Sequence, residues 1–243
     1  SHRIYQNISG DLSWAAVNGY YALAKDAYPR LNPYSSGAKA VQTWTGRTSA
    51  LDNNFWHSIC WSPQLAIFVV IAYSEGSSIR VMTSPDGITW TSRASPSNGW
   101  VRVCWSPERM LFVAVAIDGT NRVMTSPNGI NWTGRASSNE SSSWYFVCWS
   151  KERSLFVAVA NGGTSRVMTS PDGISWTGRV SSNETNTWNS VCWSPQLGLF
   201  VAVAYSGTNS VMTSPDGITW TGRTSANDAN QWYDVCWSPE LGL

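Results

Sequence analysis

Five tryptophans and five arginines recur in register through the chain, and they are the side chains best suited to hold a ligand. Each arginine precedes a loop rich in Ser, Asn and Asp, and each tryptophan follows one. An aromatic ring beside amide, hydroxyl and guanidinium groups can stack a sugar and hydrogen-bond its hydroxyls. We therefore predict ligand contacts from Trp56, Trp100, Trp144, Trp188 and Trp232, and from Arg47, Arg93, Arg135, Arg179 and Arg223. The alternative is that the tryptophans fill gaps between structural units and that each arginine satisfies a nearby carbonyl or carboxylate.

Catalytic groups do not assemble from this sequence. Nucleophilic catalysis needs a nucleophile, a base and an orienting partner, and acid/base catalysis needs placed carboxylates or histidines. The two histidines, His2 and His57, form neither a triad nor a metal-binding pattern. The glutamates are scattered through loops and turns, for example Glu75, Glu108, Glu140, Glu152 and Glu184. We therefore predict a protein that is not an enzyme and that needs no cofactor or metal.

The cysteines occur once per repeat, each directly before a tryptophan. Equivalent positions in a symmetric array are held apart, so we expect free thiols rather than disulfides. A metal ring would need histidines or a CxxC spacing, which are missing. The five are Cys60, Cys104, Cys148, Cys192 and Cys236. Such thiols allow a reducing interior as well as a virion or cell surface.

The charge pattern excludes two classes of partner. The formal net charge is +1, with 16 basic and 15 acidic side chains and lysine only at Lys25, Lys39 and Lys151. No basic stripe exists to bind nucleic acid or an anionic membrane surface. Apolar runs such as Ala66 to Tyr73 are far too short to span a bilayer, so we expect no membrane insertion.

A 44-residue repeat must position all of these side chains. Its clearest marker, Trp-Ser, falls at Trp61, Trp105, Trp149, Trp193 and Trp237. Within residues 188–223 the pattern predicts four short strands, with turns at Pro195–Gly198 and Pro215–Gly217. One four-stranded sheet cannot bury both faces alone, so the repeat predicts an all-β fold, a β-propeller of four-stranded antiparallel blades.

The blade boundaries follow from the repeat. We predict one propeller domain over residues 1–243, with blades at about 11–47, 56–93, 100–135, 144–179 and 188–223. The first copy is irregular between Lys25 and Lys39, and a partial copy at 232–243 stops inside its first turn. We expect five blades, with the partial copy closing the ring against the N-terminal blade, because an open ring leaves unpaired edges. The alternative is a longer parent chain with six or more blades.

The turns before the fourth strands resemble the Asp-box, or BNR repeat, of sialidase-type propellers. The four sequences are Ser84–Trp90, Ser126–Trp132, Ser170–Trp176 and Ser214–Trp220, each one residue shorter between Asp and Gly than the family pattern Ser-x-Asp-x-Gly-x-Thr-Trp. The resemblance implies a structural hairpin on the side away from the ligand. Asn128 replaces Asp in one copy, which favours turn chemistry over calcium binding. Sialidase chemistry in that family needs an arginine cluster, a Tyr–Glu nucleophile pair and an Asp acid/base, each placed once, whereas the arginines here recur in register.

The loops between blades differ from copy to copy while the strands hardly change. They are Ala50–Phe55, Ser95–Gly99, Ser137–Ser143, Ser181–Thr187 and Ser225–Gln231. A rigid scaffold with variable loops is typical of recognition. We therefore predict a non-catalytic, multivalent recognition module, a lectin or adhesin that binds glycans or a surface receptor at an extracellular, virion or cell surface. The alternatives are a structural propeller that docks a protein partner in a larger assembly and a sialidase-like glycosidase.

Overall fold

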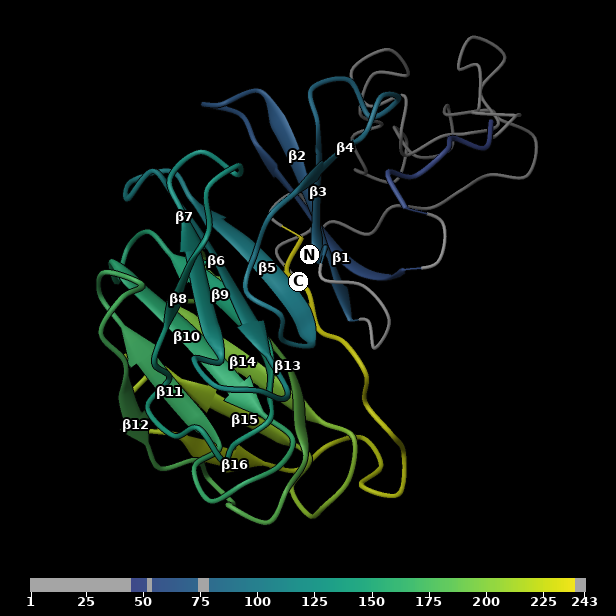
Figure 1. The fold of residues 1–243 in the computed structure, drawn as a ribbon. Coiled ribbons are helices and arrows are strands. Elements are labelled where there is room, and N and C mark those ends of the chain that lie inside the picture. The colour runs from purple at the N-terminus through teal and green to yellow at the C-terminus, as the bar shows by residue number, and fades with distance from the viewer. Residues whose placement is uncertain (1–44, 52–53, 74–78, 239–243) are drawn as a thin grey trace, which may run out of the picture. The chain divides into compact units, whose positions relative to one another are not determined.

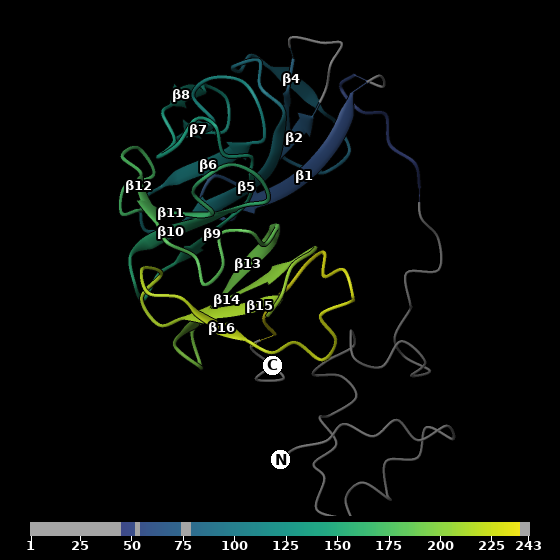
Figure 2. The same cartoon turned by 90° about the horizontal axis from the view of Figure 1, so that it is seen from below.

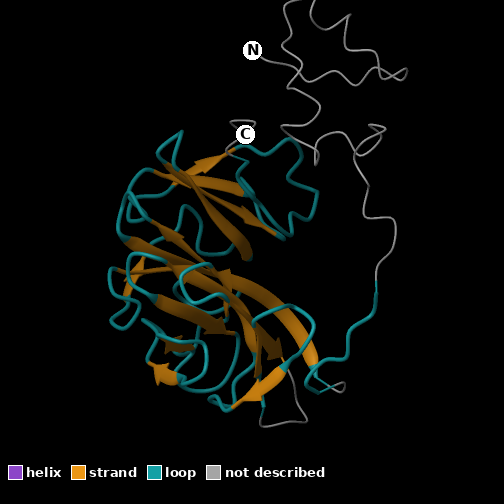
Figure 3. Cartoon of the chain, turned by 90° about the horizontal axis from the view of Figure 1, so that it is seen from above, coloured by secondary structure: helices purple, strands orange, loops and turns teal. Residues whose placement is uncertain are grey.

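The structure, a computed structural model, describes residues 45–51, 54–73 and 79–238. These residues form sixteen β-strands and no helix, and so no membrane-spanning helix (Figure 3). The strands make four separate antiparallel sheets of four strands each, and within every sheet the strands adjoin in chain order. The all-β prediction and the four-stranded antiparallel blade are confirmed.

The four sheets are blades 1 to 4. Blades 1 and 2 consist of β1 (Phe55–Ser62), β2 (Ile67–Tyr73), β3 (Val81–Ser84) and β4 (Thr91–Arg93), then β5 (Trp100–Ser106), β6 (Leu111–Ala116), β7 (Val123–Ser126) and β8 (Thr133–Arg135). Blades 3 and 4 consist of β9 (Trp144–Ser150), β10 (Leu155–Ala160), β11 (Val167–Ser170) and β12 (Thr177–Arg179), then β13 (Trp188–Ser194), β14 (Leu199–Ala204), β15 (Val211–Ser214) and β16 (Thr221–Arg223).

The remaining predicted blade lies almost entirely outside the described residues. Of residues 11–47 only the last three are described, and of the partial copy at 232–243 only residues 232–238. Five blades, and closure of the ring, therefore stay predictions.

The blades fan out around a common axis. Their first strands, β1, β5, β9 and β13, contact one another in sequence, and the short fourth strands lie at the outer edges (Figures 1 and 2). The axis is therefore lined by the strands that carry the Trp-Ser markers.

Apolar side chains between neighbouring blades form the core. The second strands are continuous apolar runs because both of their faces are covered, one by each adjacent blade. Between blades 1 and 2, for example, Val69 and Ile71 pack against Phe112 and Met124. Equivalent clusters join blades 2 and 3 and blades 3 and 4. Small residues such as Ala114, which is fully buried, allow the sheets to approach closely.

The turn between the third and fourth strands of each blade is held by its own side chains. In blade 1, Asp86 Oδ1 accepts hydrogen bonds from the backbone N–H groups of Ile88 and Thr89, both at 2.8 Å, and Ser84 Oγ accepts one from Gly87 N–H at 2.8 Å. In blade 2, Asn128 Oδ1 makes the same two bonds at 2.9 Å. The turn therefore needs an oxygen acceptor and not a charge, as the substitution in the sequence indicated.

Acid should destabilise the three turns that contain an aspartate and leave the turn with Asn128 unchanged. Hydrogen bonds from Thr89 and Ile88 N–H, and then from the Ser84 hydroxyl, lower the pKa of Asp86 from 3.8 to about 2. A lowered folded-state pKa means that the stabilisation is complete above about pH 4 and disappears as the pH falls towards 2. Asp86→Asn should melt like the wild type near neutral pH and lose less of its melting temperature near pH 2. If the wild type and Asp86→Asn lose the same melting temperature between neutral pH and pH 2, the Asp86 carboxylate does not cause the acid destabilisation.

Candidate functional site

Three of the predicted aromatic platforms lie inside the protein. Trp100, Trp144 and Trp188 are fully buried between blades, and their indole N–H groups donate to the backbone carbonyls of Pro96, Asn139 and Asn183. A ring with no exposed face cannot stack a sugar, so these three fill gaps between blades, which was the alternative interpretation. Trp56 and Trp232 are half-buried, and the structure describes no covering blade on their outer sides.

The recurrent arginines brace the outer hairpins. The Nε of Arg93, Arg135, Arg179 and Arg223 donates to the Oγ1 of the threonine ten residues earlier on the third strand, at 2.9–3.2 Å. These arginines lie on the outermost strands, whereas Trp100, Trp144 and Trp188 begin the innermost ones. The two predicted sets therefore do not converge on repeated sites. Arg47, which is exposed, and Trp56 do line one cavity, on the outer face of blade 1.

Three of the variable loops carry a buried asparagine that holds them in place. Asn98 and Asn186 are buried at the ends of two loops, and each donates to backbone carbonyls of the loop between the second and third strands of its blade, at Thr120 and Thr208 respectively. Asn54 makes the matching bond to Ile79. In each of these three cases the loop before the blade is hydrogen-bonded to the loop between the second and third strands.

Variation within the strands is concentrated at two consecutive positions. The first strands agree at Trp, at Val or Ile, and at Cys-Trp-Ser, but differ at the two residues that follow the first Trp. We call these the axial positions: His57–Ser58, Val101–Arg102, Tyr145–Phe146, Asn189–Ser190 and, in the partial copy, Tyr233–Asp234. The first strand of each blade, nearly constant elsewhere, thus carries a different pair of side chains at these two positions.

A β-bulge in each described first strand presents the axial positions. The register shifts between Trp56 and Ser58 in β1, and at the equivalent points of β5 and β13, while Tyr145 is passed over in the pairing of β9 with β10. The first axial residue of each described blade therefore has no cross-strand partner. A bulge kinks the strand and redirects its side chains, which is why bulges accompany binding sites.

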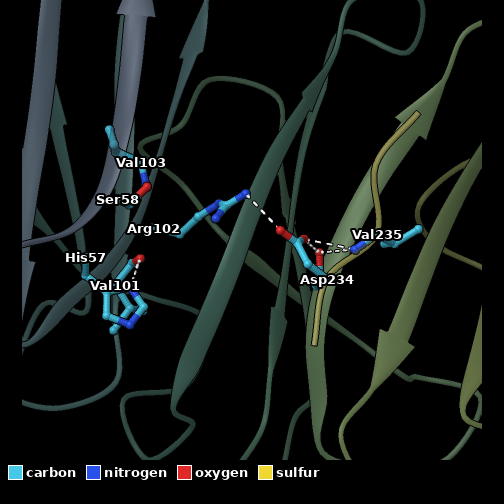
Figure 4. A network of polar contacts seen from close by, with 8 residues as sticks. His57, Ser58, Val101, Arg102, Val103, Asp234 and Val235 are labelled. Carbon is cyan, nitrogen blue, oxygen red and sulfur yellow. Dashed lines mark hydrogen bonds and ion pairs between the residues drawn. The ribbon is translucent and has the colours of Figure 1, made fainter. Parts of the chain in front are cut away.

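Arg102 connects the axial positions of three strands. Its guanidinium lies over the Phe146 ring of β9, 3.7 Å from the centroid, and its Nη2 is 3.9 Å from Asp234 Oδ2 (Figure 4). Asp234 in turn accepts a hydrogen bond from Ser190 Oγ of β13. Burial lowers the pKa of Arg102, and the charge of Asp234 opposes that effect. The guanidinium stays charged at any ordinary pH, so a cation and a carboxylate, both partly exposed, face each other across the axis.

Three tyrosines lie near one another, and one of them, Tyr233, directly precedes Asp234 in the chain. The Tyr233 ring meets the Tyr205 ring edge-on, with centroids 5.2 Å apart, and Tyr233 is 65% exposed. A hydrogen bond with Tyr205 and the nearby Tyr145 hydroxyl both raise the pKa of Tyr233. Tyr145 and Tyr233 are axial residues, and Tyr205 directly follows β14. Tyr233, one residue before Asp234, is therefore an exposed aromatic ring with two further tyrosines close to it.

The carboxylates away from the axis have structural roles. Glu108 and Glu152 accept hydrogen bonds from Trp149 and Trp193 Nε1 of the following blade, at 2.8 and 2.7 Å. The matching bond in blade 2 goes from an indole N–H to the neutral amide oxygen of Gln64 at 2.7 Å, so this contact needs no charge. These acids hold tryptophan rings in place between blades.

The cysteines are free and half-buried, apart from the exposed Cys236, as the sequence predicted. Burial raises the pKa of Cys60 and of Cys192 to about 11, so both thiols are protonated at neutral pH. They contribute packing and no nucleophile.

The sequence prediction missed the axial positions because it compared whole loops with whole strands and not single positions within the strands. A signal was present in the sequence: when the five first strands are aligned residue by residue, two columns vary and the flanking Trp and Cys-Trp-Ser columns do not.

No protein-family model and no curated protein matches the sequence. Solved structures match the fold. Virginiamycin B lyase from Staphylococcus aureus superposes with a TM-score of 0.62 at 10% identity, covering 74% of this chain and 59% of the lyase. A chain of a nidogen/laminin complex gives 0.56 at 11% identity, covering 77% of this chain and 70% of that chain. YCF48 bound to a D1 peptide gives 0.53 at 15% identity, covering 76% and 58%.

These neighbours are β-propeller proteins with repeated four-stranded blades, and they place this chain in the same architecture. The chain spans less than three fifths of the lyase and of YCF48. At such low identity the likeness concerns the fold alone.

Proposed function

We propose that the protein is a non-catalytic recognition module that binds a carbohydrate at the axial positions. The observation that carries the proposal is the concentration of first-strand variation at these two positions per blade, where Arg102 faces Asp234 and Tyr233 meets Tyr205. Variation inside strands that are otherwise similar is expected where side chains contact a ligand. One asymmetric site replaces the five equivalent sites that the sequence suggested.

The axial groups have the chemistry that sugars require. Tyrosine offers an apolar ring together with a hydroxyl, so Tyr145, Tyr205 and Tyr233 can contact the face of a pyranose and bond its hydroxyls. Arg102 supplies only donors and Asp234 only acceptors, so the pair complements sugar hydroxyls, which do both. We also keep the Asp-box family as the relationship that the turns suggest, on the strength of the shared Ser, Asp, Gly and Trp.

Absence of catalysis is part of the proposal. Ser190, the axial hydroxyl nearest a carboxylate, donates to Asp234 and accepts from Val235 N–H at 3.2 Å, and no imidazole contacts it among the described residues. His57 Nδ1 lies 2.9 Å from the carbonyl of Val101 on the neighbouring strand, which fixes its ring (Figure 4). A serine without a base is a poor nucleophile.

A glycan array probed with the intact protein tests the ligand class. We expect binding to a small set of related glycans, and Tyr233→Ala should reduce each of those signals because its ring is highly exposed beside the charged pair. Arg135→Ala, on an outer strand, is the control that should leave them unchanged. No glycan signal from the intact protein would remove the carbohydrate proposal.

A second candidate is protein docking through the opposite, turn-bearing side. Each turn between the third and fourth strands exposes an isoleucine by 39–51%: Ile88, Ile130, Ile174 and Ile218. Repeated apolar side chains on one side of a scaffold are typical of contact surfaces. Replacement of all four by threonine should abolish partner capture if this side docks, and should leave glycan binding unchanged.

A further inference from the structure

In blade 2 one carboxylate joins the loop after the fourth strand to the start of the third strand. Glu140 Oε1 accepts hydrogen bonds from the backbone N–H and from the hydroxyl of Ser137. Glu140 Oε2 accepts one from the backbone N–H of Arg122 at 3.1 Å. Ser137 lies two residues after β8, and Arg122 directly precedes β7. One acid therefore satisfies three donors beside the two outer strands.

Blades 3 and 4 keep this acid at the same place in the loop. Glu184 accepts a hydrogen bond from Ser181 N–H. Asp228 accepts bonds from the Ser225 hydroxyl and from Ser210 N–H. In all three blades the acid lies five residues after the arginine that ends the fourth strand. The contact is therefore a property of the repeat and not of one blade.

The loop of blade 1 lacks the acid. It consists of residues 94–99, which are two fewer than residues 136–143 of the next loop and include no Asp or Glu. The donor residues are nevertheless present, since Arg80 directly precedes β3 and Ser95 lies two residues after β4. The third and fourth strands also pair in the same register in blades 1 and 2. Blade 1 therefore places the same donors beside its outer strands without a carboxylate in the loop.

Polar atoms of Arg80 and Ser95 are buried without partners. Arg80 is 8% exposed, and its Nε and Nη1 have no hydrogen-bond partner. The Ser95 hydroxyl is buried and has none either. Within the part of the chain that the structure describes, no carboxylate forms an ion pair with Arg80. Arg122 differs, because it is half-buried and its Nε and Nη1 donate to the carbonyls of Gly119 and Ser142 at 3.0 and 2.9 Å.

A buried guanidinium needs an anion. Arginine does not lose its proton in a protein, and a buried charge without a counter-charge is strongly unfavourable. A carboxylate can accept two parallel hydrogen bonds from a guanidinium and can also accept from a hydroxyl or a backbone N–H. Ser95 lines a cavity of about 350 Å³ together with Pro96 and Trp132, which leaves room for a small ion beside the loop.

We propose that blade 1 binds a small carboxylate anion between Arg80 and Ser95, at the place that Glu140 occupies in blade 2. The Arg80 guanidinium, the Arg80 backbone N–H and the Ser95 hydroxyl donate to the anion. The class of ligand follows from the repeat, because the other blades place a carboxylate on the equivalent donors. The site lies beside β3 and β4 and shares no residue with the axial positions, so it does not depend on the carbohydrate proposal.

Titration of the intact protein with sodium acetate tests the site. At a constant ionic strength set with sodium chloride, acetate should shift the NMR signals of Ser95 N–H and Arg80 Nε–H and reach saturation. It should also raise the melting temperature, because it binds the folded state. Arg80→Gln should weaken the acetate affinity at least tenfold. Arg166→Gln is the matched control and should leave the affinity unchanged, because the loop beside Arg166 carries its own acid, Glu184.

A loop exchange tests the site without removing the arginine. Residues 94–99 are replaced by the sequence of residues 136–143, which supplies the acid within the chain. This variant should no longer respond to acetate. The same exchange with alanine in place of the acid should respond like the wild type, because only the carboxylate competes with acetate.

Three outcomes would contradict the proposal. No saturable shift at Ser95 or Arg80 in the wild type would exclude an anion between them. An acetate response that appears only in Glu75→Gln would mean that an acid of the chain itself neutralises Arg80. A response that persists in the loop exchange carrying the acid would mean that acetate binds elsewhere.

Discussion

Trp144→Ala should lower the free energy of unfolding by about 3–5 kcal/mol, the usual cost of removing a fully buried aromatic side chain. The Trp144 ring has no exposed surface and packs in the cluster shared by blades 2 and 3. Its indole N–H also donates to the Asn139 carbonyl at 3.2 Å, so the substitution removes one of the two hydrogen bonds that this carbonyl accepts, the other coming from Ser142 N–H. Urea unfolding of the two proteins measures the difference.

The adjacent Tyr145 provides the control. Its side chain is half-buried and lies at an axial position, so Tyr145→Ala should cost about 1 kcal/mol of stability. The two substitutions should therefore have different effects. Trp144→Ala should mainly lower the free energy of unfolding, and Tyr145→Ala should mainly weaken ligand binding. A Trp144→Ala protein that unfolds like the wild type but no longer binds a glycan would restore the original aromatic-platform hypothesis.

Gly173→Ala should destabilise nearly as much, for two separate reasons. Gly173 has φ of +73°, and a left-handed backbone costs a residue with a Cβ roughly 1–2 kcal/mol. The added Cβ would also lie 2.9 Å from Leu111 Cδ2 and 2.9 Å from Val113 Cγ2 of the preceding blade. Crowding of this kind in a packed core costs about 1–3 kcal/mol more. Thermal and urea unfolding should both report the loss.

Gly198 separates the two causes. It too has positive φ, +63°, but a Cβ added there would have no atom within 4 Å. Ala66, Met110 and Ser154 occupy the same position in other blades with φ of 47–49°. Gly198→Ala should therefore cost only the conformational part, about 1–2 kcal/mol. If Gly173→Ala and Gly198→Ala lose the same stability, the close approach of the turn to the neighbouring blade contributes nothing.

Much of the fold could be predicted because the repeat makes each element visible several times. The apolar run Leu199–Ala204, its flanking turns and its four-fold recurrence identify a strand covered on both faces, and β14 occupies these residues. The oxygen-acceptor role of Asp86 could be predicted as well, because Asn128 takes the equivalent place in another copy.

The candidate site could not be predicted in the same way. Trp144 could stack a ligand or be buried between blades, depending on how closely blade 2 approaches it. The spacing of the repeat along the chain does not give the distance between blades. Arg102 reaches Asp234 across the axis, a contact between residues far apart in the chain. The bulges could not be predicted from residue type, because the first axial residues of the four described blades have different chemical characters. A threonine recurs ten residues before each outer arginine, and this spacing could have indicated the hydrogen bond between the two side chains.

Titration of a glycan selected from the array against Arg102→Gln and Arg179→Gln tests the central claim most directly. The two substitutions remove the same charge, one at the axis and one from the outer strands that the sequence first suggested. We predict that Arg102→Gln weakens binding at least tenfold, about 1.4 kcal/mol, and that Arg179→Gln binds like the wild type. The reverse result, or equal affinity in all three proteins, would contradict recognition at the axial positions.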